Sequence, residues 1–224
     1  MLGKINIAID GPAGAGKSTV ARMVAEHLSF LYIDTGAMYR TLTYSALKNN
    51  VDVNNGSDLE KLLNNIKIEI INEGTGQKVL LNNEDITPNI RTGEVNKLVP
   101  HVASHEAVRV EMVKRQKTLA SSGNAILDGR DIGTHVLPNA QVKIFLTASV
   151  DERANRRHEE QVKKGMHSNL EELKMEIAKR DELDTTREIA PLCKAKDAIE
   201  LDTTFLTIEE VVWTIINLVK KPIS

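Results

Sequence analysis

Short apolar runs and longer amphipathic segments follow one another along this chain. Apolar runs bounded by polar residues predict buried strands, and apolar residues three or four positions apart predict helices. Five strands are predicted, at residues 5–10, 31–34, 125–128, 142–146 and 198–202. Helices are predicted after residue 16, after the segment 34–40 as far as about 48, near 59–63, from 104 to about 120, from 150 to 164, from 170 to about 183, and in the last segment, where Val211, Val212, Ile215, Ile216 and Val219 form one apolar side. This order predicts an α/β fold, a parallel five-stranded sheet with helices on both faces.

One segment departs from the alternation of strands and helices. Residues 66–70 alternate apolar and polar side chains with a period of two, residues 78–81 form a second strand, and Asp85-Ile86 is a candidate third. Residues 73–76 and Asn82-Asn83 carry turn signals between them. We interpret residues 64–99 as a small antiparallel β insert in a single domain that spans residues 1–224. An edge hairpin with a purely structural role is an equally good interpretation.

Length, charge and cysteine content narrow the class of protein. A chain of 224 residues suits one compact domain with a large core. Its net charge of −2 gives no basic field for a nucleic-acid or membrane partner. The single cysteine, Cys193, excludes an internal disulfide, and the apolar run that ends at Asp10 is too short for a secretion signal or a membrane span. We expect a cytoplasmic protein, and we expect it to be a monomer.

The strongest motif follows the first predicted strand. It has the form Gly-x-x-x-x-Gly-Lys-Ser between a strand and an amphipathic helix, which is the setting of a phosphate-binding loop. Glycines let successive backbone N–H groups point to one place, and the start of the helix adds positive potential there. Lys17 then reaches the β- and γ-phosphates of a nucleoside triphosphate, and the Ser18 hydroxyl ligates Mg²⁺. The predicted binding residues are Gly11, Pro12, Ala13, Gly14, Ala15, Gly16, Lys17, Ser18 and Thr19. A glycine-rich turn that merely packs is the alternative.

Three further polar clusters stand directly after predicted strands. They are residues 34–36, residues 128–131 and the charged helix after Leu146. Ligands of parallel α/β sheets bind beyond the carboxyl ends of the strands. We therefore expect these clusters and the phosphate-binding loop to line one crevice.

Arginines and carboxylates accumulate near these clusters. The set comprises Arg40, Arg130, Arg153, Arg156, Arg157, Arg180, Asp181, Asp184 and Arg187. For the three arginines between residues 150 and 164, a solvated helix face is an equally good interpretation. Transfer of a phosphoryl group between two polyanions gives such arginines a task, because two phosphates must be held in line and the moving charge offset. Arginine suits that task, since its guanidinium binds phosphate in a bidentate manner and stays charged.

Together these motifs resemble the bacterial cytidylate kinases, a family within the nucleoside monophosphate kinases. The resemblance rests on residues 11–19, on Asp-Thr-Gly-Ala-Met-Tyr-Arg at 34–40, on Asp-Gly-Arg-Asp-Ile-Gly-Thr at 128–134, on Arg180-Asp181 with Asp184 and Arg187, and on Pro191-Leu192. It implies a P-loop NTPase three-layer fold, in which the insert at 64–99 closes over a monophosphate and a short helical lid at 153–167 closes over ATP. It also implies transfer of the γ-phosphoryl group of ATP to CMP and dCMP in pyrimidine metabolism, with Mg²⁺.

The resemblance implies roles for individual side chains. Thr35, Arg40, Arg130 and Arg187 would hold the phosphate or ribose side of the acceptor. Arg109 and Asp131 would read the cytosine edge, Arg180 would bridge toward the phosphates, Asp184 would accept from the ribose hydroxyls, and Arg153 and Arg157 would come down on the transferring group. The chemistry of Asp131 fits this role, because cytosine offers an amine donor where uracil offers only a carbonyl acceptor.

One position departs from the family pattern. Pro100 stands where the family usually has a small hydroxyl residue that touches the base, nine positions before Arg109. Proline has neither a side-chain donor nor a backbone N–H, so we expect weaker selection against UMP.

Other functions are compatible with the phosphate-binding loop alone. They are a kinase for another small acceptor such as UMP, AMP or shikimate, a nucleotide-dependent switch, and a nucleic-acid-dependent ATPase. Asn96-Lys97 is followed by Leu98 and Val99, so the tetrapeptide that reads guanine in GTPases is missing. The net charge of −2 gives the nucleic-acid-dependent class no support.

Overall fold

A computed structural model describes residues 4–73 and 76–220 and contains the predicted parallel sheet. The strands stand in the order β2-β6-β1-β7-β8, and every neighbouring pair is parallel. Their bounds are β1 Asn6–Asp10, β2 Leu31–Asp34, β6 Ala125–Gly129, β7 Val142–Thr147 and β8 Ile199–Asp202. The prediction of five strands is confirmed to within two residues at each end.

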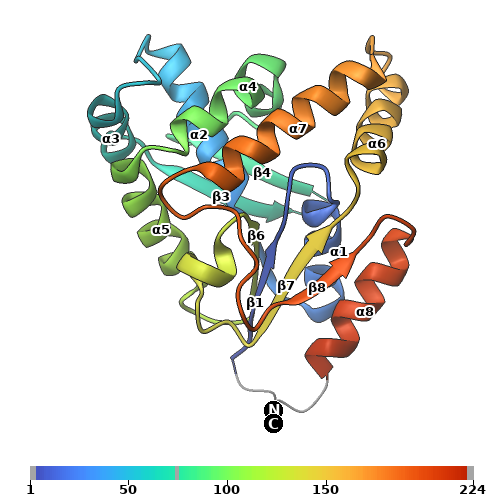
Figure 1. Ribbon diagram of the computed structural model, residues 1–224. Coiled ribbons are helices and arrows are strands. Elements are labelled where there is room, and N and C mark those ends of the chain that lie inside the picture. The colour runs from blue at the N-terminus through green and yellow to red at the C-terminus, as the bar shows by residue number, and fades with distance from the viewer. Residues whose placement is uncertain (1–3, 74–75, 221–224) are drawn as a thin grey trace.

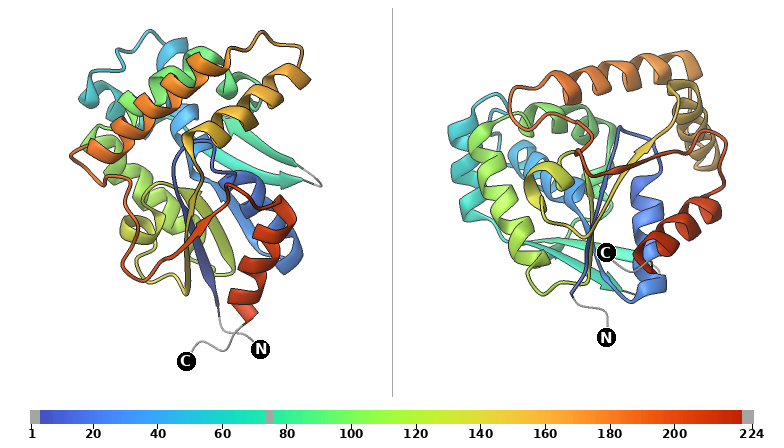
Figure 2. Two further views of the ribbon diagram at one scale, coloured as in Figure 1. Left: turned by 45° about the vertical axis from the view of Figure 1, so that its right-hand side comes forward. Right: turned by 60° about the horizontal axis from the view of Figure 1, so that its bottom comes forward.

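Helices cover both faces of this sheet (Figure 1), as the alternating pattern predicts. The α-helices are α1 Lys17–Leu28, α2 Thr35–Lys48, α3 Gly56–Asn65, α4 Gly93–Val102, α5 Glu106–Ala120, α6 Val150–Lys163, α7 Leu170–Thr186 and α8 Ile208–Lys220. The views in Figure 2 agree that α1 and α8 lie together on one side of the sheet. Successive strand residues point to opposite faces, so Ile7 and Ile9 pack toward α1 and α8, whereas Ala8 packs with Ala120 of α5.

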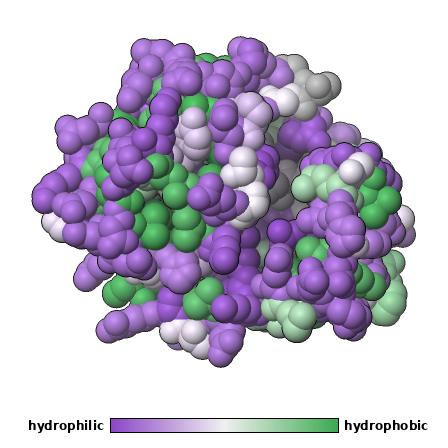
Figure 3. All heavy atoms as spheres, turned by 90° about the horizontal axis from the view of Figure 1, so that it is seen from above, coloured by the Kyte–Doolittle hydropathy of each residue, from purple (hydrophilic) through white to green (hydrophobic). Residues whose placement is uncertain are grey.

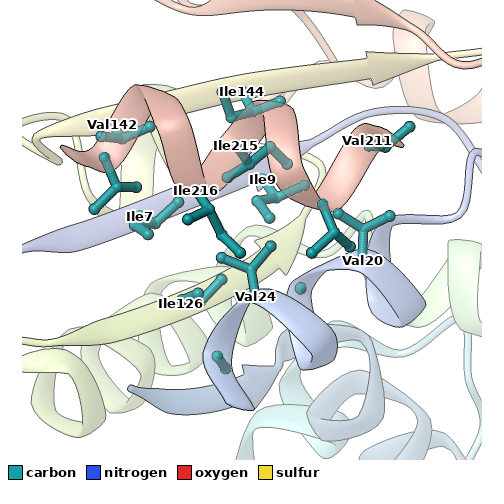
Figure 4. Packing of buried hydrophobic residues seen from close by; sticks show 14 of the residues in the cluster. Ile7, Ile9, Val20, Val24, Ile126, Val142, Ile144, Val211, Ile215 and Ile216 are labelled. Carbon is teal, nitrogen blue, oxygen red and sulfur yellow. The ribbon is translucent and has the colours of Figure 1, made fainter. Parts of the chain in front are cut away.

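The core under α1 and α8 is built from branched aliphatic side chains (Figure 4). Val20 and Val24 of α1 and Ile215 and Ile216 of α8 meet the strand residue Ile126, and all five are at most 2% exposed. The apolar side predicted for the last helix is therefore its buried side. Burial of these side chains holds the five strands in register, and their carboxyl ends consequently form one edge.

The predicted insert contains a three-stranded antiparallel sheet, β3 Ile68–Glu73, β4 Gly76–Leu81 and β5 Glu84–Asp85. Asn82 and Asn83 have φ values of 51° and 71°, which confirms the predicted turn between β4 and β5. Residues 74 and 75, at the centre of the other predicted turn, lie outside the described residues.

The prediction is wrong for residues 93–99, which are helical. A 3₁₀ turn, η1 Asn89–Arg91, is followed by α4, whose N-terminus is capped by the Thr92 hydroxyl accepting from the backbone N–H of Val95 at 3.3 Å. Pro100 lies inside α4 and cannot donate to the carbonyl of Asn96. Glycine and proline are poor helix formers. Gly93 at the start of α4 and Pro100 near its end therefore hide the helical pattern of this segment.

α6 and α7 form an antiparallel pair beside the carboxyl ends of the strands (Figure 1). A small apolar cluster joins them, with Ala154 of α6 packed on Leu173 and Ile177 of α7. Gly165 follows the end of α6 with a φ of 71°, as the sequence predicts for a helix stop. Within the described ranges, no helix combines the length and the apolar character that a membrane span requires.

We predict that Ile215→Ala lowers the free energy of unfolding by about 3 kcal/mol, because it leaves a cavity in the core between α8 and the sheet. The matched control is Ile208→Ala, the same truncation in the same helix at a side chain that is 46% exposed. We expect it to cost about 1 kcal/mol or less. Urea unfolding of both variants measures the difference. Equal losses would mean that this face of α8 is not part of the core.

Candidate active site

The loop between β1 and α1 has the glycine-dependent shape that the motif predicts. Gly14 and Gly16 adopt left-handed φ values of 79° and 84°. Gly11 has a φ of 148°, and a Cβ there would lie 2.0 Å from the carbonyl oxygen of Leu146, so only glycine fits. α1 begins directly after the loop at Lys17, and its first N–H groups have no acceptor within the helix. The backbone thus meets the requirements of an anion-binding loop.

Lys17 is buried at the end of this loop. Its Nζ donates to the carbonyl oxygen of Pro12 at 2.6 Å, which turns the side chain back over the loop. Burial lowers the pKa of Lys17 well below its ordinary value, and the charge of Arg130 lowers it further. A cation placed in a region of low dielectric interacts strongly with an anion that comes beside it.

Ser18 points toward Asp128 at the end of β6. Its hydroxyl donates to Oδ2 of Asp128 at 2.8 Å, and the Tyr32 hydroxyl donates to Oδ1 at 3.0 Å. Burial raises the pKa of Asp128 to about 6, and the nearby charge of Asp34 adds to this effect. The sequence motif contains Asp128 without indicating its role, because only the pairing of β1 with β6 brings it to the loop.

The oxygens of Ser18 and Asp128 suit a magnesium ion. Mg²⁺ prefers hard oxygen ligands and keeps several waters, so one or two protein oxygens and substrate phosphates suffice. In the part of the chain that the structure describes, no group of three or more His, Cys, Asp and Glu side chains is arranged to hold a metal. One hydroxyl and one carboxylate therefore fit an ion that a phosphate chain helps to bind.

Two arginines converge on Asp34 at the end of β2. Nη1 of Arg40 lies 3.6 Å from Oδ1 of Asp34, and Nη2 of Arg91 lies 3.0 Å from Oδ2. Thr35 is buried beside them and donates its hydroxyl to the backbone carbonyl of Asp128 at 2.6 Å. Arg91 is absent from the sequence-based candidates, since it stands in the insert, 57 positions from Asp34. Its side chain remains 55% exposed and open to a ligand.

A second carboxylate, Asp131, lies between two other arginines. Arg109 reaches it from α5 and donates Nη2 to Oδ2, while Arg187 lies 3.4 Å from Oδ1. Arg109 is only 3% exposed, and its guanidinium carbon lies 5.8 Å from the centre of the Tyr39 ring. The structure therefore brings together the two residues expected to read a base edge, Arg109 and Asp131, although they are 22 positions apart.

Arg130, Arg180 and Asp184 form a third group. Nε of Arg130 donates to Oδ2 of Asp184 at 2.7 Å. Burial alone would raise the pKa of Asp184, but the Arg130 guanidinium lowers it below its ordinary value. Burial and the charge of Arg130 lower the pKa of Arg180 to about 10. Arg180 lies within the predicted range of α7, and Asp184 also lies on this helix because it continues to Thr186, beyond its predicted end near Leu183.

Arg153 of α6 contacts the phosphate-binding loop and does not lie on a solvated helix face. It is 4% exposed, its Nη1 donates to the carbonyl oxygen of Ala13 at 3.0 Å, and its Nη2 lies 2.6 Å from Asp181. Arg157 is one-third exposed and pairs with Glu176 of α7 at 3.7 Å. The charge of Arg157 lowers the pKa of Arg180, so Arg157 lies near the third group.

Three buried guanidinium nitrogens in these groups make no hydrogen bond to any described residue: Arg40 Nη1, Arg109 Nε and Arg180 Nε. Buried donors are almost always satisfied in folded proteins, so unsatisfied donors on cations indicate an anionic or polar ligand. Figure 3 looks down on this side of the molecule and shows mainly hydrophilic side chains there. The predicted convergence of the polar clusters at one edge of the sheet is confirmed.

Known proteins resemble this chain over nearly its whole length. The family model described as Cytidylate kinase matches residues 7–221. The cytidylate kinase of Bacillus cytotoxicus is 58% identical over 221 residues, which cover 99% of this chain and 98% of that protein. The cytidylate kinase of Halalkalibacterium halodurans is 57% identical over 218 residues, which cover 97% and 98% of the two chains.

Among solved structures, an uncharacterised protein from Eubacterium ventriosum superposes with a TM-score of 0.51 at 12% identity, covering 96% of this chain and 98% of that one. At this low identity the similarity concerns the fold alone. The sequence relatives match nearly the whole length, and they confirm the resemblance inferred from the motifs. The chain belongs to the cytidylate kinase family, with a P-loop kinase fold.

Proposed function

We propose that this protein transfers the γ-phosphoryl group of ATP to CMP, and also to dCMP, giving ADP and the cytidine diphosphate. The observation that carries the proposal is the arrangement at one sheet edge of a phosphate-binding loop and three arginine–carboxylate groups with unsatisfied buried donors. Names of close relatives support the choice of acceptor. We further propose that the protein acts as a monomer in the cytoplasm, in pyrimidine nucleotide metabolism.

On the donor side, residues 11–19 would bind the phosphates of ATP. The backbone of the loop and the charge of Lys17 neutralise the β- and γ-phosphates. Mg²⁺ would be held by Ser18, with Asp128 as partner of the Ser18 hydroxyl, and when bound it supplies positive charge between the phosphates. Arg153 is already placed against Ala13 and can stabilise charge that develops on the moving group.

On the acceptor side, the arginines would hold the monophosphate in line with ATP. The charge of Asp128 acts on both Arg40 and Arg130, and each arginine has a carboxylate partner, Asp34 and Asp184 respectively. Arg91 adds a third, exposed guanidinium near Arg40 through their shared partner Asp34. The acceptor phosphate is itself the nucleophile and is deprotonated at neutral pH, so the reaction needs no strong general base.

At the base end, Asp131 and Arg109 would read the edge of cytosine. A carboxylate accepts from the exocyclic amine of cytosine and repels the carbonyl of uracil. Asp131 is 5% exposed, so its charge is weakly screened. Asp184 and Arg187 would contact the ribose side, and a deoxyribose would lose one hydroxyl contact without a clash.

Arg180 and Arg157 complete the proposed transfer site. Arg180 has a buried Nε without a partner in the described chain and lies beside Arg130, where acceptor and donor phosphates would meet. Arg157, which is one-third exposed and lies near Arg180, would reach the phosphates when α6 and α7 close over ATP. Closure would exclude water that otherwise hydrolyses ATP.

We predict that ADP release in the presence of ATP and Mg²⁺ depends on the acceptor, with CMP and dCMP fastest in a panel that also contains UMP, AMP, GMP and shikimate. A coupled assay for ADP measures each rate. A lead by AMP, GMP or shikimate would assign the site to another small-molecule kinase. Slow hydrolysis that no acceptor accelerates would indicate a nucleotide-dependent switch.

We predict that Asp128→Asn raises the Mg²⁺ concentration needed for half-maximal activity by about 10-fold or more, because the partner of the Ser18 hydroxyl loses its charge. Activity is measured over a Mg²⁺ titration, and excess EDTA should abolish it in the unmodified enzyme. Asp52→Asn, at an exposed side chain between α2 and α3, serves as the control. An unchanged Mg²⁺ requirement in Asp128→Asn would contradict the assignment.

We predict that Pro100→Ser increases the preference for CMP over UMP by about 2- to 10-fold, the value of one added hydrogen bond. Pro100→Ala is the matched control, since it also restores the backbone N–H inside α4 but adds no hydroxyl. The ratio of kcat/KM values for CMP and UMP is the measured quantity. If both variants give the ratio of the unmodified enzyme, Pro100 does not relax base selection.

A further inference from the structure

Asp10 is a buried carboxylate for which the reaction proposed above has no use. It is the last residue of β1, immediately before the phosphate-binding loop, and it is 4% exposed. Its Oδ1 accepts from the backbone N–H of Ile132 at 2.8 Å, and its Oδ2 accepts from that of Gly133 at 2.7 Å. These hydrogen bonds join segments 122 and 123 positions apart.

The two amides begin η2, one π-helical turn over Ile132–Val136. The first N–H groups of any helix lack acceptors within the helix, and buried ones need a partner from elsewhere. Asp10 supplies that partner for two of them. A buried carboxylate with two short N–H donors is a strong and directional anchor.

The residue directly before these amides is Asp131. Its carbonyl oxygen accepts from the N–H groups of His135 and Val136 at 2.9 and 3.2 Å. Two sets of hydrogen bonds therefore fix the backbone that follows the Cα of Asp131. The N–H groups of η2 hold its carbonyl oxygen, and Asp10 holds the next two amides. This backbone sets the direction of the Asp131 side chain toward Arg109 and Arg187.

The rest of this loop has a separate anchor. Nζ of Lys143, on β7, donates to the carbonyl oxygen of Pro138 at 2.5 Å and pairs with Asp197 at 2.7 Å. The Nζ of Lys143 holds the loop after η2, whereas its aliphatic stem packs beside Gly133. Replacing Lys143 with Met keeps an unbranched stem beside Gly133 and removes only the Nζ contacts, so the two anchors can be compared.

We propose that Asp10 is a positioning residue for acceptor recognition. It holds the amides beside Asp131, and so it sets the base-reading carboxylate against its two arginines. Because Asp10 also ends the strand that leads into Gly11, it fixes the base-reading loop relative to the phosphate-binding loop. The inference rests on the proposed function in that Asp131 is taken to contact the acceptor.

The variant Asp10→Asn tests the proposal, because its amide can accept only one of the two N–H groups and repels the other. We expect the KM for CMP to rise about tenfold or more, which corresponds to one hydrogen bond to a charged group. We expect the KM for ATP to change less than twofold and the preference for CMP over UMP to fall. A parallel rise in the KM for ATP, or no change in either KM, would overturn the proposal.

Lys143→Met is the matched control, since it loosens the other anchor of the same loop. It should lower stability to urea without changing the preference for CMP over UMP. The same loss of preference in both variants would show a general loosening of the loop and would contradict a specific role for Asp10. If the unmodified enzyme prefers another acceptor, the proposed function fails, and the same comparison made with that acceptor still tests Asp10.

A measurement on the unmodified protein covers the case in which Asp10→Asn does not fold. Amide hydrogen exchange followed by NMR should show the N–H groups of Ile132 and Gly133 protected as strongly as those of β1. Exchange as fast as that of exposed loop amides would overturn the proposed anchor.

Discussion

Repulsion between arginines at one edge of the sheet is the constraint on which the rest of the site depends. Cations cannot be crowded into a region of low dielectric unless each has a carboxylate beside it. Asp34 forms ion pairs with Arg40 and Arg91, and Asp131 forms them with Arg109 and Arg187. Asp184 pairs with Arg130, and Asp181 pairs with Arg153. Some guanidinium donors nevertheless remain unsatisfied, so the site is built to receive further negative charge.

These ion pairs also connect elements that are far apart in the sequence. Asp34 on β2 joins α2 to the insert through Arg40 and Arg91, and Asp184 on α7 joins Arg130 after β6. The insert has a second link to the core, since Asn72 and Gln77 donate their side-chain amides to the carbonyl oxygen of Tyr32 on the edge strand β2 at 3.0 and 3.2 Å. A ligand that takes over arginine contacts thus acts on several elements at once.

The two halves of the site meet at β1 and β6. Gly11 and Lys17 follow β1, and Asp128, Arg130 and Asp131 end or follow β6, its neighbour in the sheet. This adjacency brings the phosphate-binding loop and the charged residues after β6 together without any long connection. Burial raises the pKa of Asp128 and lowers that of Lys17, because it disfavours the charged form of each group. A partner of opposite charge offsets this cost, so both groups favour a bound ion of opposite charge.

Local patterns in the chain are enough to predict the strands, most helices and the phosphate-binding loop, because hydrophobic periodicity and glycine spacing act over a few residues. They also place the arginines at strand ends, where a parallel sheet must gather them. They do not predict α4, whose Gly93 and Pro100 mask a helix capped by Thr92, nor the burial of Arg153 against Ala13. The pairing of Arg91 with Asp34 and of Asp10 with the amides of η2 likewise joins residues 57 to 123 positions apart. Such contacts follow from strand order and helix packing, which bring distant residues together and which no local pattern encodes.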